Sequence, residues 1–334
     1  MIRSERRTGL RMNNCLYIVI PCYNEQEVLK ETAARLKKQS SVLINQGKIH
    51  QNSHVLFVND GSTDHTWELI EKLYQADKFY CGLNLSNNRG HQNALIAGIM
   101  TAKNYADMVI TMDADLQDDI SAIPEMIDKY LGGCDIVYGV RSYRRSDTIF
   151  KRVSAKAYYR LMNRLGVKLI YNHADFRLMN KRALEGLEQF GEVNLFLRGI
   201  IPMIGYRTDI VAYERGTRFA GETKYPLKRM LTFGWEGITS FSIQPIRIIS
   251  AIGVTIFSFS VLMLIYIFTR YLTGHTIVGW ASVAVSVWAI GGLILLSLGI
   301  VGEYIGKIYL EAKKRPKYFI ENFLHEADLT EHQE

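Results

Sequence analysis

Two long uncharged stretches near the C-terminal end constrain this chain more than any other feature. Residues 248–269 and 276–302 contain no Asp, Glu, Lys or Arg. Each stretch is long enough to cross the roughly 30 Å hydrocarbon core of a bilayer as a helix. Two buried helices of a water-soluble core are the alternative, but such helices rarely run this far without charge. The sequence therefore predicts a membrane protein with two transmembrane helices.

Only residues 270–275 separate the two stretches, so we expect a hairpin. Basic residues crowd outside both ends of this hairpin, whereas its turn carries only Arg270. They are Lys224, Lys228, Arg229 and Arg247 before it, and Lys307, Lys313, Lys314, Arg315 and Lys317 after it. Cytoplasmic flanks of membrane helices are rich in Lys and Arg. We therefore expect a cell-membrane protein whose two chain ends and soluble domain are cytoplasmic.

The N-terminal segment and the cysteines point to the same compartment. Residues 1–14 are polar and basic without a long apolar run, so we expect no signal peptide. The four cysteines form no Cys-x-x-Cys pair, which argues against a zinc site or a disulfide framework. The net charge of +7 comes without a nucleic-acid motif. It favours a membrane surface and phosphate ligands as partners, not nucleic acid.

Short apolar runs alternate with helical patterns in the first half of the chain. The runs, rich in β-branched or aromatic residues, cover residues 16–20, 55–59, 80–85, 108–112 and 136–140. The helical patterns cover residues 25–39, 66–75, 93–103 and 123–131. This alternation predicts βαβ units and an α/β domain with a mostly parallel sheet. Ligands of such sheets bind beyond the carboxyl ends of the strands.

Polar motifs follow three of the predicted strands. They are Pro-Cys-Tyr-Asn-Glu at 21–25, Asp-Gly-Ser-Thr-Asp at 60–64 and Asp-Ala-Asp-Leu-Gln at 113–117. Because parallel strands end at one edge of the sheet, we expect the motifs to share one rim. The carboxylates of Asp113 and Asp115, with the amide oxygen of Gln117, suit a divalent cation that also holds a diphosphate.

The first two motifs carry groups that can bind a nucleotide. Tyr23 can stack on a base and Glu25 can bind a ribose hydroxyl. Asp60 can accept a hydrogen bond from a base N–H. Plain structural roles are the alternatives: residues 60–62 can form a turn before a helix cap, and Tyr23 can be a core residue.

The region from residue 141 to residue 227 is less regular. We expect helices at 150–165 and 183–189 and a strand at 207–213. Residues 215–225 are polar and basic and contain two glycines. They predict a mobile lid over a bound nucleotide donor and a phosphate, and a solvated connector is the alternative. Residues 227–243 mix apolar and charged side chains and predict a helix in the membrane interface, or else one packed on the soluble domain.

These patterns divide the chain into five parts. They are an N-terminal tail (1–14), a catalytic domain (15–226), a juxtamembrane helix (227–245), two transmembrane helices (246–306) and a cytoplasmic tail (307–334).

The motifs taken together resemble glycosyltransferase family 2. Within it they look like the polyprenyl-phosphate glycosyltransferases, relatives of dolichol-phosphate mannose synthase and bactoprenol glucosyltransferases. Besides the rim motifs and the membrane segments, residues 88–94, 135–141, 174–179 and 221–225 match. The last stretch has Thr223 where the family usually has Ser, which keeps the hydroxyl. The likeness covers residues 16 to about 317.

This resemblance implies a GT-A fold, which is a Rossmann-like α/β catalytic domain. It implies Mg²⁺- or Mn²⁺-dependent, inverting transfer from a nucleotide sugar to a polyprenyl phosphate. The implied metal ligands are Asp113, Asp115 and Gln117, and the implied nucleotide-binding residues are Pro21, Tyr23, Glu25, Asp60 and Asp113. Candidates for the acceptor phosphate are Arg141, Arg152, Arg215, Arg218 and Lys224, because Arg binds phosphate bidentately and Lys binds it as a point charge.

The family also implies Asp175 as the catalytic residue. A phosphate monoester has a second pKa of about 6 and is mostly ionised at neutral pH, so it does not strictly need a base. Asp175 can instead orient the sugar or hold a basic neighbour. Both roles stay open at the level of sequence.

The sequence orders the donors without naming one. UDP-glucose is the first candidate donor, UDP-N-acetylglucosamine the second, and GDP-mannose or a modified pentose follow. The expected acceptor in a bacterium is undecaprenyl phosphate, for use in the cell envelope. Two spans and the lack of Gln-x-x-Arg-Trp favour transfer of a single sugar. The alternatives are transfer to another membrane lipid or glycan, and an inactive nucleotide-sugar-binding scaffold for a flippase. Homo-oligomer formation is open.

Overall fold

The computed structural model describes residues 14–142, 173–192, 196–214, 216, 244–273 and 279–325. The chain divides into two compact units. The first takes in Met1–Ala157, Leu169–Lys224 and Pro316–Glu334, and the second takes in Tyr158–Lys168 and Tyr225–Arg315. The first unit thus contains chain from both sides of the two apolar stretches.

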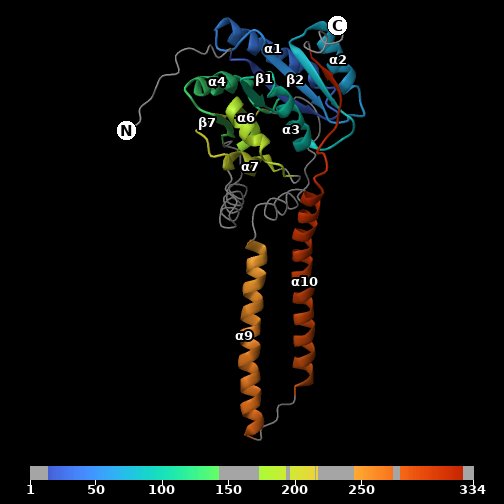
Figure 1. The fold of residues 1–334 in the computed structure, drawn as a ribbon, viewed down its shortest axis with the longest axis vertical. Coiled ribbons are helices and arrows are strands. Elements are labelled where there is room, and N and C mark those ends of the chain that lie inside the picture. The colour runs from blue at the N-terminus through green and yellow to red at the C-terminus, as the bar shows by residue number, and fades with distance from the viewer. Residues whose placement is uncertain are drawn as a thin grey trace, which may run out of the picture. The chain divides into compact units, whose positions relative to one another are not determined.

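An eight-stranded mixed sheet forms the centre of the first unit (Figure 1). Its strands are β1 (Leu16–Cys22), β2 (His54–Asn59), β3 (Tyr80–Leu85), β4 (Met108–Thr111), β5 (Ile136–Arg141), β6 (His173–Asn180), β7 (Thr208–Tyr213) and β8 (Ile320–Leu324). Their order in space is β7-β5-β6-β4-β1-β2-β3-β8. The α/β architecture expected from the sequence is confirmed.

The central strands are the apolar runs that the sequence singled out. All seven residues of β1 are buried, and β1 pairs in parallel with β2 and with β4. A strand that is covered on both faces needs apolar side chains at every position, which is why these runs are continuous instead of alternating. The carboxyl ends of β1, β2 and β4 therefore lie at one edge of the sheet.

Helices cover both faces of the sheet. They are α1 (Leu29–Asn45), α2 (Thr66–Ala76), α3 (His91–Ala102), the 3₁₀ turn η1 (Ile120–Ala122), α4 (Ile123–Leu131), α6 (Lys181–Glu188) and α7 (Leu197–Met203). Ile18 and Phe57 share a buried cluster with Leu36 of α1 and Met126 of α4. On the opposite face α3 lies so close that a Cβ on Gly98 would come within 2.4 Å of Val19.

Six of the eight strands run in one direction, as the expectation of a mostly parallel sheet requires, and two antiparallel strands make the sheet mixed. β6 runs antiparallel to β4 and β5, and β8 runs antiparallel to β3. The β6 sequence, His-Ala-Asp-Phe-Arg-Leu-Met-Asn, places charged residues within the strand, which hides its apolar pattern. β8 lies in the segment that the sequence assigned to a cytoplasmic tail. Neither segment carried a readable strand signal, and the short helix α7 was missed as well.

Aromatic side chains fasten the segment after β8 to the sheet. His325 is buried, and its Nε2 lies 2.9 Å from the hydroxyl oxygen of Tyr17 on β1. The His325 ring also stacks on Phe323, with ring centroids 5.2 Å apart. The C-terminal segment is thus an integral edge of the sheet.

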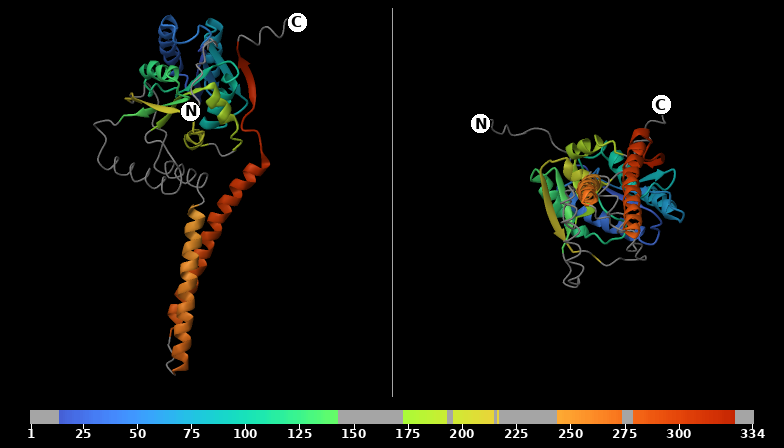
Figure 2. Two further views of the ribbon diagram at one scale, coloured as in Figure 1. Left: turned by 60° about the vertical axis from the view of Figure 1, so that its left-hand side comes forward. Right: turned by 90° about the horizontal axis from the view of Figure 1, so that it is seen from below.

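The second unit contains two long apolar helices, α9 (Gln244–Leu272) and α10 (Trp280–Lys313), which pack alongside each other (Figures 1 and 2). By length and composition, Pro245–Met263 and Ile290–Lys313 are candidate membrane spans, and the side chains in these windows are not buried. At about 1.5 Å per residue, the 29 and 34 residues of α9 and α10 exceed a bilayer core. The expected pair of long apolar helices is confirmed.

Several boundaries differ from the sequence prediction. α1 covers Leu29–Asn45 where residues 25–39 were expected. α10 continues to Lys313, eleven residues beyond the uncharged stretch, because good helix formers follow it. The helix predicted at 150–165 and the interfacial helix predicted at 227–243 lie outside the described residues. Residues 244 and 245, assigned to the juxtamembrane part, open α9.

Candidate active site

Hydrogen bonds join the first two motifs at the carboxyl rim. Asn24, which has a left-handed φ of 55°, donates its backbone N–H to Ser62 Oγ at 3.0 Å. Its side-chain oxygen accepts the backbone N–H of Thr63 at 2.9 Å. The backbone N–H of Glu25 reaches Thr66 Oγ1 at 2.9 Å. These bonds fix residues 24 and 25 in a turn, which is why α1 starts later than expected.

Asp60 organises the loop that leads into α3. It is buried, and its two carboxylate oxygens accept the backbone N–H groups of Arg89 at 2.7 Å and of Gly90 at 2.9 Å. Burial raises the pKa of Asp60, and these two hydrogen bonds oppose that rise. Asp60 thus has a structural role in this loop, which differs from the turn before a helix cap that the sequence offered as the alternative. Contact between Asp60 and a nucleotide base stays a prediction.

The remaining nucleotide candidates of the first motif lie at the end of β1. Pro21 is buried within the strand, paired with Val58 of β2. Tyr23 is 42% exposed, so it is not a core residue and can stack on a ligand. Glu25 is partly exposed. The structure thus brings Tyr23 and Glu25 to the rim, with Pro21 beneath them.

The Asp-x-Asp motif forms a tight loop after β4. Leu116 takes a left-handed φ of 57°, and the backbone N–H of Gln117 donates to Asp115 Oδ1 at 3.1 Å. Thr32 Oγ1 of α1 donates to the carbonyl of Ala114 at 2.9 Å, which holds the loop against the helix. The loop is therefore positioned by the fold before any ligand binds.

The carboxylates at this loop are poised for a cation. Desolvation raises the pKa of Asp113 to about 6; nearby His91 opposes the rise, whereas the carboxylates of Asp118, Asp175 and Asp115 add to it. A divalent ion would relieve this repulsion, and paired carboxylate oxygens are suitable donors. No trio of His, Cys, Asp or Glu in the described ranges is gathered to hold a metal. That Asp113, Asp115 and Gln117 hold the ion stays a prediction.

Asp175 lies on β6, beside the Asp-x-Asp loop, and faces basic groups. Its carboxylate forms an ion pair with Arg177 and is 3.0 Å from Nη2 of Arg198; His91 Nε2 lies 3.6 Å from it. The same His91 nitrogen lies 3.6 Å from Asp113. Burial alone would raise the pKa of Asp175, but Arg198, His91 and Arg177 hold it well below its usual range. A carboxylate held in this way is a weak base at neutral pH.

Arg141 ends β5 and is held by acidic and phenolic partners. Its Nη2 lies 3.2 Å from Oδ1 of the fully buried Asp118, and its Nε donates to the Tyr213 hydroxyl at 3.2 Å. Tyr213 in turn donates to Asp118. Arg141 is therefore fixed beside the metal-loop candidate. Arg152, Arg215, Arg218 and Lys224 lie outside the described residues, so their roles stay predictions.

One residue of the predicted lid is described. Gly216 donates its backbone N–H to the carbonyl of Gln117 at 2.9 Å, and an added Cβ would meet the Leu116 carbonyl at 3.2 Å. The start of the 215–225 segment thus touches the Asp-x-Asp loop. The rest of that segment lies outside the described residues.

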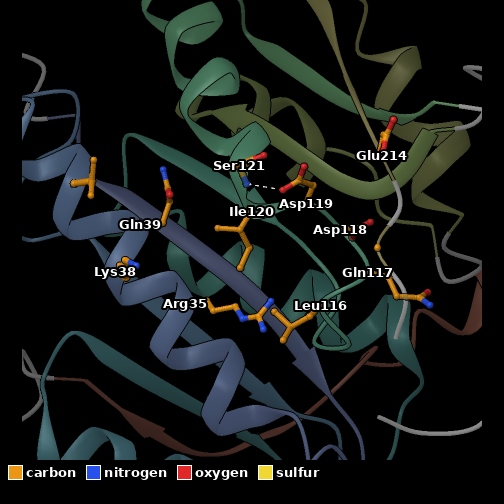
Figure 3. Close-up of a pocket in the computed structure, with 12 residues that line it drawn as sticks. Arg35, Lys38, Gln39, Leu116, Gln117, Asp118, Asp119, Ile120, Ser121 and Glu214 are labelled. Carbon is orange, nitrogen blue, oxygen red and sulfur yellow. Dashed lines mark hydrogen bonds between the residues drawn. The ribbon is translucent and has the colours of Figure 1, made fainter. Parts of the chain in front are cut away.

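A pocket of about 490 Å³ lies between α1 and residues 116–121 (Figure 3). Arg35 points from α1 toward Leu116, and Gln117, Glu214 and Gly216 complete the wall. The pocket borders the Asp-x-Asp loop but includes neither of its aspartates and not Asp175. It is a neighbour of the acidic rim and not part of it.

Sequence reasoning missed several residues of this site. His91, Arg177 and Arg198 surround Asp175, and Asp118 and Tyr213 hold Arg141. His91 and Arg177 lie inside stretches that resemble the family, so a signal was available for both. Nothing in the sequence around Arg198 indicated its place.

An α/β domain of this topology, with an acidic pair and the partly exposed Tyr23 and Glu25 on one rim, fits the class of glycosyltransferases with a GT-A-like fold. The model of "Glycosyl transferase family 2" matches residues 17–187. The chain belongs to glycosyltransferase family 2 and is a glycosyltransferase.

Similar proteins agree with this assignment along most of the chain. The "Uncharacterized glycosyltransferase YkoT" of Bacillus subtilis (strain 168) is 54% identical over 315 residues, which cover 94% of each chain. The "Bactoprenol glucosyl transferase" of Shigella phage SfV is 37% identical over 307 residues, which cover 91% of this chain and 97% of that one. Among solved structures, glucosyl-3-phosphoglycerate synthase from Mycobacterium tuberculosis, in complex with Mn²⁺ and UDP, shows a TM-score of 0.42 at 15% identity, covering 68% of this chain and 76% of that one.

Proposed function

We propose that the chain transfers one sugar from a nucleotide sugar to a polyprenyl phosphate at the cytoplasmic face of the cell membrane. UDP-glucose is the first candidate donor, UDP-N-acetylglucosamine the second, and undecaprenyl phosphate the candidate acceptor. The observation that carries the proposal is one rim that combines the carboxylates of Asp113 and Asp115 with the guanidinium groups of Arg141 and Arg198. The relatives named bactoprenol glucosyl transferase support the choice of acceptor.

The residues of the rim divide the chemistry between them. Asp113 and Asp115 would hold a Mg²⁺ or Mn²⁺ ion, which when bound neutralises charge on the departing nucleoside diphosphate. Tyr23 would stack on the base and Glu25 would bind a ribose hydroxyl. Arg141 offers a fixed guanidinium to a phosphate.

The reaction itself is a single displacement. A bond forms between an acceptor phosphate oxygen and the anomeric carbon, and the bond from that carbon to the donor diphosphate breaks, which inverts the configuration. The acceptor oxygen is already an anion near neutral pH. No proton need be removed, in keeping with a low pKa for Asp175.

The two apolar helices explain why a lipid acceptor fits this chain. A polyprenyl phosphate keeps its chain in the bilayer and exposes only its phosphate at the surface. An enzyme anchored by α9 and α10 can meet that phosphate without extracting the lipid. An inactive scaffold would not need the charged groups that the fold gathers around Asp175.

A donor and acceptor screen tests the proposal. Purified protein in detergent with undecaprenyl phosphate and Mn²⁺ or Mg²⁺ is supplied with radiolabelled UDP-glucose, UDP-N-acetylglucosamine or GDP-mannose in separate reactions. We expect one donor to yield a labelled lipid that mild acid cleaves. Binding of a nucleotide sugar without any labelled product, also when total membrane lipid is added, would favour the scaffold instead. Label in a different lipid or in a glycan would replace the acceptor.

Membrane topology gives a second test. We expect both ends of the hairpin to be cytoplasmic because basic residues crowd there. In a variant without native cysteines, a cysteine at His275 should react with an impermeant reagent in intact cells, and a cysteine at Lys317 should react only after permeabilisation. The opposite pattern would place the catalytic domain on the side without nucleotide sugars and contradict the proposed function.

A further inference from the structure

Arg198 is a partly exposed cation on a rigid support. Its helix α7 is anchored by the buried side chains of Leu197, Ile200 and Ile201. The backbone N–H of Leu197 also donates to Oε1 of Gln92 on α3 at 3.1 Å. The position from which Arg198 extends is therefore fixed on two sides, by the core and by α3.

Asp175 fixes the other end of the Arg198 side chain. Nη2 of Arg198 lies 3.0 Å from Oδ2 of Asp175, and Nε lies 3.4 Å from Oδ1. The Asp175 side chain is only 12% exposed, whereas the Arg198 side chain is 43% exposed. A nearly buried carboxylate thus contacts one edge of the guanidinium of a side chain that is partly exposed. This arrangement orients the planar group in advance.

The local balance of charge leaves room for an anion. Asp175 is shared between Arg198 and the fully buried Arg177, so two positive charges meet one negative charge. Nε and Nη1 of Arg177 have no hydrogen-bond partner within the described part of the chain. The Asp175 carboxylate is thus shared by both guanidinium groups and does not neutralise both of them by itself.

Arg198 also lies within electrostatic reach of the groups proposed to handle phosphate. Its pKa is raised first by Asp175 and further by Asp113, whereas Arg141 and burial oppose the rise. Arg198 thus interacts electrostatically both with Asp113 of the metal-loop candidate and with Arg141.

We propose that Arg198 binds a phosphate oxygen of a substrate and that Asp175 is the residue that positions it, in place of acting as a base. This inference rests on the proposed function, because the phosphate is either the acceptor monoester or the diphosphate of the donor. A purely structural ion pair between β6 and α7 is the competing explanation. It would not require that the arginine side chain remain partly exposed.

Four variants test this assignment: Arg198→Ala, Arg198→Lys, Asp175→Asn and the control Arg182→Ala. Arg182 is an exposed arginine on α6 that lies 4.0 Å from Asp135, outside the site. KM is measured for each substrate with the other saturating, and UDP binding with Mn²⁺ is measured by calorimetry. We expect Arg198→Ala to raise at least tenfold either the acceptor KM, which identifies the acceptor phosphate, or the UDP dissociation constant, which identifies the donor diphosphate.

The positioning role of Asp175 has its own signature. If Asp175 orients Arg198, Asp175→Asn weakens binding of the same substrate as Arg198→Ala does. Arg198→Lys then recovers part of the lost binding, because lysine keeps the positive charge but lacks the planar guanidinium. If Asp175 is a base, Asp175→Asn lowers kcat and leaves both KM values and UDP binding unchanged. That result, or an Arg198→Ala variant that is folded by thermal unfolding yet unchanged in both constants, overturns the inference.

The same experiment separates the inference from the proposed function. A wild-type protein that binds UDP but transfers no sugar to polyprenyl phosphate contradicts the proposed function. The UDP-binding arm still reports on Arg198 in that case, since it needs no turnover. An unchanged UDP dissociation constant in Arg198→Ala would then count against the inference as well.

Discussion

Replacement of Asp115 by alanine is expected to reduce sugar transfer to background. Asp115 shapes the Asp-x-Asp loop through its bond to the Gln117 N–H and supplies one of two carboxylates for a divalent ion. Without the metal ion, the leaving diphosphate loses several kcal/mol of transition-state stabilisation, so the barrier rises by that amount. At about 1.4 kcal/mol per tenfold, this corresponds to a loss on the order of a thousandfold.

The measurement has two parts. Initial rates are compared across a Mn²⁺ series, and UDP binding is measured with Mn²⁺ and with a chelator. Asp115→Ala should bind UDP with the same weak affinity in both conditions, and its amount in the membrane fraction should be normal. Asp128→Ala is the matched control, because Asp128 is a surface aspartate that pairs with Lys48. Full activity of Asp115→Ala in metal-free buffer would contradict a metal-binding role for Asp115.

Alanine at Gly61 should damage the site through the backbone. Gly61 has a φ of 63°, and a Cβ there would lie 2.4 Å from the backbone nitrogen of Asn88. A left-handed residue with a side chain costs about 1–2 kcal/mol, and overpacking adds about 1–3 kcal/mol. The loop held by Asp60 must then move away. We expect roughly 2–5 kcal/mol of lost stability and at least tenfold weaker UDP binding.

A second glycine isolates the cause. Gly47 has a similar φ of 69° but has no atom within 4 Å of its added Cβ. Gly47→Ala therefore carries the backbone cost without the collision, and it lies outside the site. Denaturant unfolding and UDP calorimetry are compared for the two variants. Equal destabilisation, with UDP binding intact in both, would show that the close approach to Asn88 does not matter.

The central strands could be predicted because burial on both faces leaves a plain record in the sequence. Residues 16–20 and 108–112 are apolar at almost every position, since no face of those strands meets water. β6 carries Asp175 and Arg177 within the strand because it supplies the site, and the same charges conceal it. β8 has three exposed positions and follows the long apolar helix α10, so its pairing with β3 depends on contacts distant in sequence.

The residues of the candidate site were likewise predictable in part and hidden in part. Asp113 and Asp115 follow a readable strand, so their place at the rim could be inferred from local sequence. Arg198 reaches Asp175 from a short helix with a proline inside it, 23 residues further along the chain. Only the three-dimensional fold makes that pair, and no local pattern encodes it. The choice between Asp175 as a base and as a holder of basic neighbours depended on this contact.

The pairing of β8 with β3 limits how many times the chain between β7 and β8 can cross a bilayer. One sheet folds within one aqueous compartment, so the chain between β7 and β8 must cross a bilayer an even number of times. A single crossing would place β8 on the opposite side of the bilayer and leave the edge of β3 unpaired. Among the described residues of this stretch, the two candidate spans in α9 and α10 satisfy this rule without any appeal to flanking charge. Deletion of either α9 or α10 alone would therefore disrupt the catalytic sheet, whereas deletion of both would leave its two parts on the same side.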